Sequence, residues 1–245
     1  MNIVEFKNVS KCFVNKKEII DVIDNISFDI KKGEIVAIVG PSGCGKSTIL
    51  NLISKLEKEN EGIININGSI GYMFQKDNLL PWRDVYQNIT IGLEIQNKMK
   101  EIYLKNVDEL IKKYHLDSFK HFFPKELSGG MKQRVALIRT LSLNPDILLL
   151  DEPFSALDYQ TKLIVQDDIY NIIKNEHKTT ILVTHDISEA ISLADKVIVL
   201  TNRPAKIKLI QEINFDLENR TPLLARKNPK YNEYFNTVWE AITNG

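Results

Sequence analysis

One stretch of the sequence decides the fold: Gly40-Pro41-Ser42-Gly43-Cys44-Gly45-Lys46-Ser47-Thr48. It fits the pattern G-x-x-x-x-G-K-[ST], a phosphate-binding loop whose backbone N–H groups surround the phosphates of a nucleotide. Its glycines let the backbone approach a ligand closely and adopt positive φ angles. The pattern predicts that Lys46 reaches the β- and γ-phosphates and that the Ser47 hydroxyl ligates Mg²⁺.

The residues on either side of the loop agree with this interpretation. Residues 34–39 are mostly apolar and predict a buried strand that runs into the loop. Beyond the loop, apolar residues recur at helical spacing: Ile49, Leu52, Ile53 and Leu56. We therefore expect a helix that packs on a sheet and directs its N-terminal dipole at the phosphates. The alternative, a glycine-rich turn with an exposed lysine, does not explain this strand–loop–helix context.

The bulk composition restricts the class of protein. A chain of 245 residues is one large domain or two small ones, with an ample core. Its 32 basic and 32 acidic side chains balance, which leaves no overall field to attract nucleic acid or an anionic membrane. No apolar run approaches the roughly 18 residues that span a bilayer. Any role at a membrane is therefore expected to come through a partner.

The two cysteines, Cys12 and Cys44, indicate a reducing cytoplasm, because the first residues lack the apolar core of a signal peptide. They form no C-x-x-C pair and have no zinc-binding spacing. Cys44 lies in the phosphate-binding loop just before a predicted helix, a position that is expected to lower the pKa of its thiol. Alkylation at Cys44 should then compete with the nucleotide. A disulfide with Cys12 is not expected, because the two predicted positions are too far apart.

The N-terminal part alternates apolar and polar residues and predicts three short strands, at residues 4–6, 11–14 and 26–30. Phe13, in this part, is a core aromatic or a site residue. At the other end of the chain, residues 231–242 predict a short terminal helix.

Two strands in the middle of the chain end in polar side chains. Residues 147–150, after Asp146, form an apolar run that is typical of a parallel strand buried on both faces, and Asp151 and Glu152 follow it. Residues 180–184 form a similar run that ends at His185. Open α/β sheets bind ligands at the carboxyl ends of their strands, so the two carboxylates are candidate site residues.

Residues 70–74 predict a further strand, which ends at Gln75. The loop after it carries Leu79, Leu80 and Trp82 around a proline, and such residues are unusual on a free surface. Trp82 either packs into the core of the helices that follow or, with the leucines, offers a surface to a partner.

Residues 84–127 have helical periodicity and no strand pattern, which predicts a helical insertion into an α/β core. The turn Ser128-Gly129-Gly130 begins another helix, with Ser128 as its N-cap. Such a turn is a second potential anion site, although Ser-Gly-Gly is also ordinary loop sequence.

In this order the motifs resemble the ATPase subunits of ATP-binding-cassette (ABC) transporters. The resemblance is carried by the phosphate-binding loop, Gln75, Leu127-Ser128-Gly129-Gly130-Met131, Asp151-Glu152, Ser155-Ala156-Leu157-Asp158 and His185. The Leu-Ser-Gly-Gly sequence separates this family from other phosphate-loop ATPases. Residues 74–83, Asn202-Arg203-Pro204 and Asn228-Pro229 are similar to the nitrate, sulfonate and taurine importer branch.

The resemblance implies an α/β fold: a phosphate-loop (RecA-like) mixed-sheet core with an N-terminal antiparallel β subdomain and an inserted α-helical subdomain. The whole chain is then a single cassette. The core is expected at about residues 1–75 and 145–205, the helical insertion at about 76–144, and a C-terminal tail at about 206–245.

The resemblance also implies how ATP and Mg²⁺ are held. Residues 40–48 bind the phosphates, and Phe13 stacks on the adenine, where the family more often has tyrosine. Ser47 and Gln75 ligate Mg²⁺, and Asp151 holds it through water.

Hydrolysis is assigned to three side chains by the same resemblance. Glu152 is the general base for the attacking water, which is a role that contributes about 10²–10⁴-fold. His185 contacts the γ-phosphate and aligns Glu152 with the water, and Gln75 completes the catalytic set.

Partners follow from the family as well. In this family the turn of Ser128, Gly129 and Gly130 meets ATP held by the other subunit, so the working unit is expected to be a dimer of identical chains, with Asp158 at the seam. Integral membrane permease subunits are expected to dock on Leu79, Leu80 and Trp82. An extracytoplasmic substrate-binding protein is an indirect partner.

The alternative is a soluble ABC-type ATPase that acts on nucleic acid or ribosomes. Such proteins usually carry tandem cassettes, long coiled-coil insertions or zinc motifs, which this sequence lacks. The resemblance favours an importer subunit at the cytoplasmic face of the cell membrane, with no nucleic-acid partner.

Overall fold

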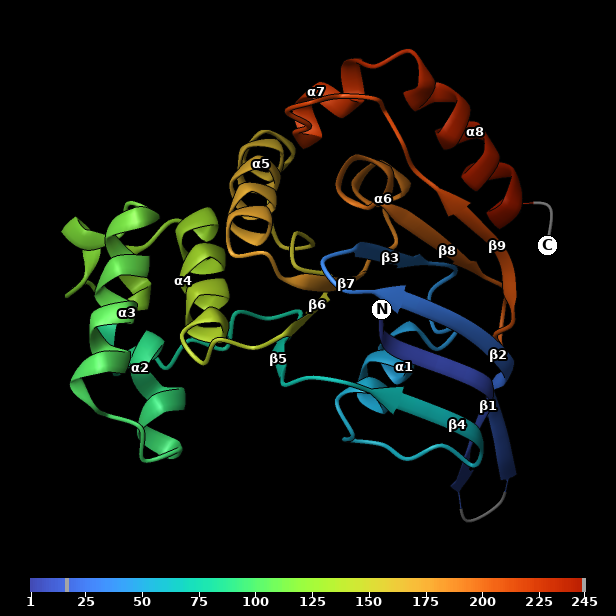
Figure 1. Ribbon diagram of the computed structural model, residues 1–245, viewed down its shortest axis with the longest axis horizontal. Coiled ribbons are helices and arrows are strands. Elements are labelled where there is room, and N and C mark those ends of the chain that lie inside the picture. The colour runs from blue at the N-terminus through green and yellow to red at the C-terminus, as the bar shows by residue number, and fades with distance from the viewer. Residues whose placement is uncertain (16–17, 244–245) are drawn as a thin grey trace.

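The computed structural model describes residues 1–15 and 18–243 of the chain, and it contains two β-sheets (Figure 1). The smaller sheet has the order β2-β1-β4 and is antiparallel; its strands are β1 (Asn2–Asn15), β2 (Glu18–Lys31) and β4 (Glu61–Ile66). The larger has the order β5-β6-β7-β3-β8-β9; its strands are β3 (Ile35–Val39), β5 (Ile70–Met73), β6 (Ile147–Asp151), β7 (Thr179–Val183), β8 (Lys196–Leu200) and β9 (Ile207–Glu212). All neighbours in the larger sheet are parallel except β8 and β9.

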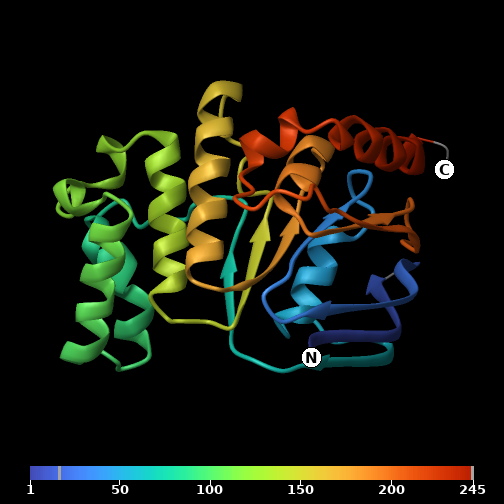
Figure 2. The ribbon, with the colours of Figure 1, turned by 45° about the horizontal axis from the view of Figure 1, so that its top comes forward.

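The helices fall into groups around this larger sheet (Figures 1 and 2). Their bounds are α1 (Lys46–Ile53), α2 (Val85–Ile95), α3 (Glu101–Lys113), α4 (Gly129–Leu141), α5 (Tyr159–Asn175), α6 (Ile187–Leu193), α7 (Pro222–Lys227) and α8 (Lys230–Thr243). Figure 1 shows α2, α3 and α4 together to the left of the sheet, and α7 and α8 across its top. Among the described residues, no helix combines the length and apolar character that crossing a bilayer requires.

The alternating side chains of β3 separate two hydrophobic cores. Ile35, Ala37 and Val39 belong to the core that packs against α4, α5 and α6. Val36 and Ile38 point the other way, into the core shared with α1 and the small sheet. All five side chains are buried, as expected for a parallel strand covered on both faces. The loop after β3 is therefore anchored from both sides.

The small sheet differs from the prediction, because two long strands replace the three short ones. β1 and β2 stay paired along nearly their whole length, with register shifts between Phe6 and Val9. Asn8 and Asn25 have φ angles of 50° and 51°, a left-handed conformation that asparagine tolerates better than most residues. Such irregularities interrupt the alternation of apolar residues along each strand. The sequence pattern therefore predicts short, separate strands where the structure has long ones.

Two further differences from the prediction concern helix α1 and strand β9. Helix α1 ends at Ile53, so that Leu56, predicted on its apolar face, is 62 % exposed. Lys55, with a φ of 60°, is left-handed and ends the helical path. Strand β9 was not predicted; it is an edge strand with alternating partial burial, which gives a weak apolar signal. The predicted terminal helix is confirmed as α8.

Candidate functional site

A cavity of about 510 Å³ opens at the carboxyl end of β3. We call it the phosphate-loop cavity; it is lined by Phe13, Ile20, Val22, Ser42, Gly43, Gly45, Lys46, Ser47, Thr48, Glu152 and Arg203. The structure thus brings Phe13, most of the loop and Glu152 to one place. Three lining residues were not predicted. Ile20 and Val22 have the pattern of ordinary strand residues, and Arg203 follows the distant strand β8.

The phosphate-binding loop passes directly into α1. Gly43 and Gly45 have φ angles of 75° and 123°, which residues with a side chain rarely adopt. A Cβ on Gly45 would also lie 3.0 Å from Cγ1 of Val22. The ammonium group of Lys46, the first residue of α1, donates to the carbonyls of Gly40 at 2.8 Å and Pro41 at 2.9 Å. Its side chain therefore lies back across the loop.

Cys44 corrects a prediction. The side chain is 2 % exposed, and a Cβ on Gly40 would lie 3.1 Å from its Sγ and 3.1 Å from Cβ of Leu200. Burial raises the pKa of the Cys44 thiol and outweighs the nearby charge of Lys46, which acts in the opposite direction. The expected lowering of this pKa is wrong, because burial of the thiol in the core outweighs the charge of Lys46 and the backbone N–H groups at the start of the helix.

Asp151, at the end of β6, faces the start of α1. The Ser47 hydroxyl donates to Oδ1 of Asp151 at 3.3 Å, and the Tyr72 hydroxyl donates to Oδ2 at 3.4 Å. Burial raises the pKa of Asp151 and is opposed by the hydrogen bond from Ser47. Burial, followed by the charge of Asp151, also raises the pKa of Tyr72. A hydroxyl and one carboxylate, both of which offer oxygen ligands suited to a hard metal ion, thus lie together beside the loop.

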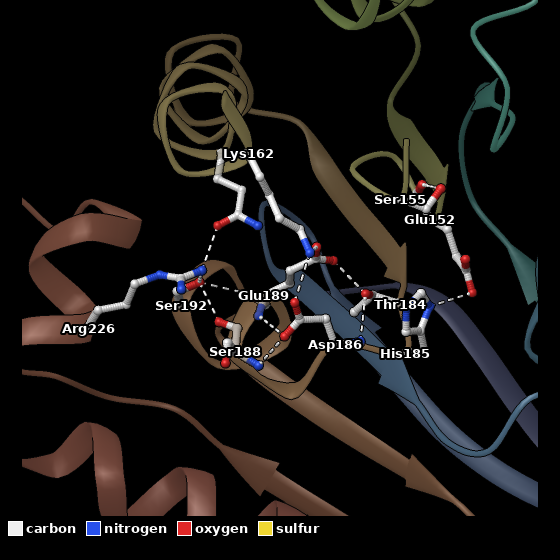
Figure 3. Close-up of polar contacts among 11 residues, drawn as sticks. Glu152, Ser155, Lys162, Thr184, His185, Asp186, Ser188, Glu189, Ser192 and Arg226 are labelled. Carbon is white, nitrogen blue, oxygen red and sulfur yellow. Dashed lines mark hydrogen bonds and ion pairs between the residues drawn. The ribbon is translucent and has the colours of Figure 1, made fainter. Parts of the chain in front are cut away.

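Glu152 is held by side chains from the two neighbouring strand ends. Nε2 of Gln75, after β5, donates to Oε2 of Glu152 at 3.1 Å. Nδ1 of His185, after β7, lies 3.1 Å from Oε1 of the same carboxylate (Figure 3). Glu152 has a φ of 44°, an uncommon value for a residue with a side chain, and its N–H donates to the Val183 carbonyl at 2.8 Å. Parallel alignment of β5, β6 and β7 is what brings these side chains together.

Phe13 also lines the phosphate-loop cavity. The ammonium group of Lys11 lies 4.7 Å from the centre of its ring. That lysine is fixed by an ion pair with Glu57 at 3.0 Å and by the Lys58 carbonyl at 2.8 Å. One face of the ring is therefore occupied by a protein cation.

Other predicted site residues do not line this cavity. Ser128 caps α4, as predicted, because its Oγ accepts from the Met131 N–H at 3.3 Å. Gly129 is exposed, whereas a Cβ on Gly130 would lie 2.7 Å from Cγ2 of Val165, so close packing against α5 requires a glycine there. Asp158 caps α5 by accepting from the Thr161 N–H at 3.1 Å.

The residues that were predicted to dock a partner lie in the loop before α2 and differ in how far they are exposed. Leu79 is only 8 % exposed and packs in the larger core, which corrects its assignment to an interface. Leu80 is half-buried, and Trp82 is 70 % exposed, so Trp82 does not pack into the helices. Asn88, fully buried and missed by the sequence analysis, fixes the loop: its side chain accepts from the Leu80 N–H at 2.7 Å and donates to the Leu80 and Arg83 carbonyls.

The fold and this site define a phosphate-loop nucleotide-binding protein with a carboxylate-rich strand edge. Residues 23–155 match the family described as ABC transporter. The chain belongs to this family and is one of its ATP-binding ATPase subunits.

Individual relatives span most of the chain. The uncharacterized ABC transporter ATP-binding protein YtlC of Bacillus subtilis is 39 % identical over 250 residues, which cover 99 % of this chain and 96 % of the relative. The aliphatic sulfonates import ATP-binding protein SsuB of Bacillus cereus is 42 % identical over 220 residues, 86 % of each chain. A solved dimer of the ATP-binding cassette MJ0796, bound to ADP and Pi after hydrolysis, has a TM-score of 0.73 and 32 % identity, covering 86 % of this chain and 99 % of its own. The predicted family and fold class are confirmed.

Proposed function

We propose that this chain is the energy-coupling ATPase subunit of an importer for a small anion or organic solute, at the cytoplasmic face of the cell membrane. The similarity to a sulfonate import ATP-binding protein supports this class of cargo. One observation carries the enzymatic part: Glu152 lines the phosphate-loop cavity and is held there by Gln75 and His185.

In this proposal the phosphates of ATP lie against the backbone N–H groups of residues 42–48, at the N-terminus of α1. Lys46 exchanges the carbonyls of Gly40 and Pro41 for the β- and γ-phosphate oxygens, a short movement of one flexible side chain. Phe13 offers the ring face that Lys11 leaves uncovered to the adenine.

The residues beside the loop fit Mg²⁺. Mg²⁺ prefers oxygen ligands and is usually held by one or two carboxylates together with substrate phosphates. The Ser47 hydroxyl and the amide oxygen of Gln75 would ligate the ion, and the Asp151 carboxylate, whose Oδ1 lies 3.3 Å from the Ser47 hydroxyl, would hold it through water. When bound with ATP, the ion would neutralise the charge of the phosphates.

Hydrolysis is assigned to the residues that meet at the strand ends. Glu152 accepts the proton of the attacking water, and the contacts to Gln75 and His185 fix the direction in which its oxygens point. The imidazole of His185, 58 % exposed, remains available to the γ-phosphate.

Two identical chains are proposed to form the working unit. Ser128, Gly129 and Gly130 do not line the phosphate-loop cavity of their own chain, so we assign this exposed helix start to ATP on the partner. The dimeric cassette solved with ADP and Pi supports that arrangement. Asp158 is placed at the seam, and the exposed Trp82 with Leu80 at the permease contact.

Isolation of the native complex tests the proposal. We expect the chain to be purified with an integral membrane protein, and its ATP hydrolysis to rise when the cognate binding protein carries an alkanesulfonate or a similar small solute. Purification with RNA or ribosomes, together with ATP hydrolysis that no membrane protein stimulates, would contradict the transport assignment.

A further inference from the structure

Both chain neighbours of His185 are connected to one lysine. The ammonium group of Lys162, near the start of α5, lies 2.8 Å from Oδ2 of Asp186 and 2.5 Å from Oε1 of Glu189 (Figure 3). The Thr184 hydroxyl donates to the other oxygen of Glu189 at 2.5 Å. Lys162 therefore contacts Asp186 directly and Thr184 through Glu189.

The Lys162–Glu189 part of this network is shielded from water, whereas the Asp186 side chain is 32 % exposed. The Lys162 side chain is 18 % exposed and that of Glu189 is 3 % exposed. The Asp186 side chain also caps α6 by accepting from the N–H groups of Ser188 and Glu189. The N–H of Asp186 donates to the Thr184 hydroxyl at 3.1 Å. Hydrogen bonds between charged groups are stronger where water is excluded. The segment 184–186 is thereby fastened to both α5 and α6.

The ring of His185 makes a polar contact of its own with Glu152, at 3.1 Å between Nδ1 and Oε1. The side chain is 58 % exposed, so packing alone does not fix its direction, and its approach to Glu152 depends on the backbone on either side. We propose that Lys162 is a positioning residue that holds His185 beside Glu152. The inference rests on the proposed role of His185 in hydrolysis.

The position of Lys162 also connects His185 to the start of α5. The Lys162 N–H donates to the Asp158 carbonyl at 2.9 Å, within the first turn of the helix that Asp158 caps. Movement of this helix start, which we place at the dimer seam, would displace Lys162 and with it the His185 segment. A partner subunit that contacts Asp158 thus acts on the histidine through one side chain.

The position of the histidine ring is the first readout, because it needs no ATP hydrolysis. Ring signals in ¹H–¹⁵N spectra of the full chain are assigned to His185 by their loss in His185→Ala. Lys162→Met should shift the His185 signals, and Lys162→Arg, which keeps the charge, should leave them near their original positions. Lys174→Met is the matched control on the same helix, since Lys174 pairs with Asp195 at 3.1 Å and not with the His185 segment. Unchanged His185 signals in Lys162→Met overturn the proposal.

Kinetics give the second readout. Lys162→Met should lower kcat at least about tenfold and leave KM for ATP within about twofold, because the lysine acts on a group of the hydrolytic step. Lys162→Arg should restore most of the rate. In a His185→Ala background the same change should cause no further loss, since the two residues act in series. An additive loss overturns the proposal. If His185→Ala hydrolyses ATP normally while Lys162→Met still shifts the ring signals, the positioning stands and the proposed role of His185 fails.

A second variant covers the case in which Lys162→Met does not fold. Loss of the lysine leaves Glu189 buried and unpaired, whereas Lys162→Met/Glu189→Gln removes both charges and keeps an oxygen for the Thr184 hydroxyl. This double variant should show the same shift of the His185 signals. A wild-type histidine spectrum in it overturns the proposal.

Discussion

Replacement of Glu152 by glutamine tests the chemistry of the site with little change of shape. Glu152 accepts from Nε2 of Gln75 at 3.1 Å and lies 3.1 Å from Nδ1 of His185. A glutamine satisfies both neighbours if its oxygen accepts from Gln75 and its amide donates to the neutral imidazole. Stability and ATP affinity should therefore change little.

The rate should change much more, because an amide cannot accept the proton of the attacking water. Loss of a general base lowers turnover by about 10²–10⁴-fold. At about 1.36 kcal/mol for each factor of ten, this corresponds to about 2.7–5.4 kcal/mol of transition-state stabilisation. ATP should then accumulate on the protein and hold two chains together.

Three measurements on the purified chain check this prediction. Phosphate release at saturating Mg-ATP gives turnover, equilibrium titration gives ATP affinity, and size-exclusion chromatography with ATP reports the dimer. Glu109→Gln, which changes an exposed carboxylate of α3, is the control and should behave as wild type. Turnover of Glu152→Gln within about threefold of wild type would refute the assignment of the base. A large loss of ATP affinity would refute the argument that glutamine preserves the contacts.

Three further predictions test other parts of the structure. Iodoacetamide at neutral pH should label Cys12 before Cys44, because Cys44 is buried and its pKa is raised; equal labelling, measured by peptide mass spectrometry, contradicts this placement. Asn88→Ala should lower the free energy of unfolding by about 2–3 kcal/mol, because buried partners of its side chain lose their hydrogen bonds. Urea denaturation measures this, and a loss below about 0.5 kcal/mol would show that the loop does not depend on Asn88. Trp82→Ala should leave the melting temperature of the free chain nearly unchanged, since the ring is 70 % exposed, but weaken permease binding; unfolding of the free variant would place the tryptophan in the core.

The site divides into parts that sequence could and could not predict. Its loop is a contiguous motif, so the residues that bind phosphate stand next to one another in the chain. Gln75, Glu152 and His185 could be named because each ends an apolar strand, but their contacts depend on the strand order β5-β6-β7. Asn88 and Lys162 were missed, because each is an ordinary polar residue within a helix whose partners are fixed only by folding.

Cys44, on the buried side of the phosphate-binding loop, is a second case that sequence alone could not predict. Sequence places Cys44 at the start of a helix, and that local pattern predicts a reactive thiol. Only the tertiary structure buries Cys44 in the core that includes Leu200 of β8, and this burial raises the pKa of the thiol instead of lowering it. Leu79 and Trp82 are close in sequence and both have large hydrophobic side chains, yet Leu79 is buried and Trp82 is exposed.

By itself, the sequence determined the family, the phosphate-binding loop, the apolar strands of the larger sheet and the order of its motifs. These features are local, since they depend on residue spacing and on the periodicity that a strand or helix imposes. The tertiary structure decided which strand ends meet, which face of the loop is buried and which lysine holds the His185 segment. The physical reason is that burial and ion pairing depend on distances across the fold, such as that between Lys162 and Glu189, which no local pattern encodes.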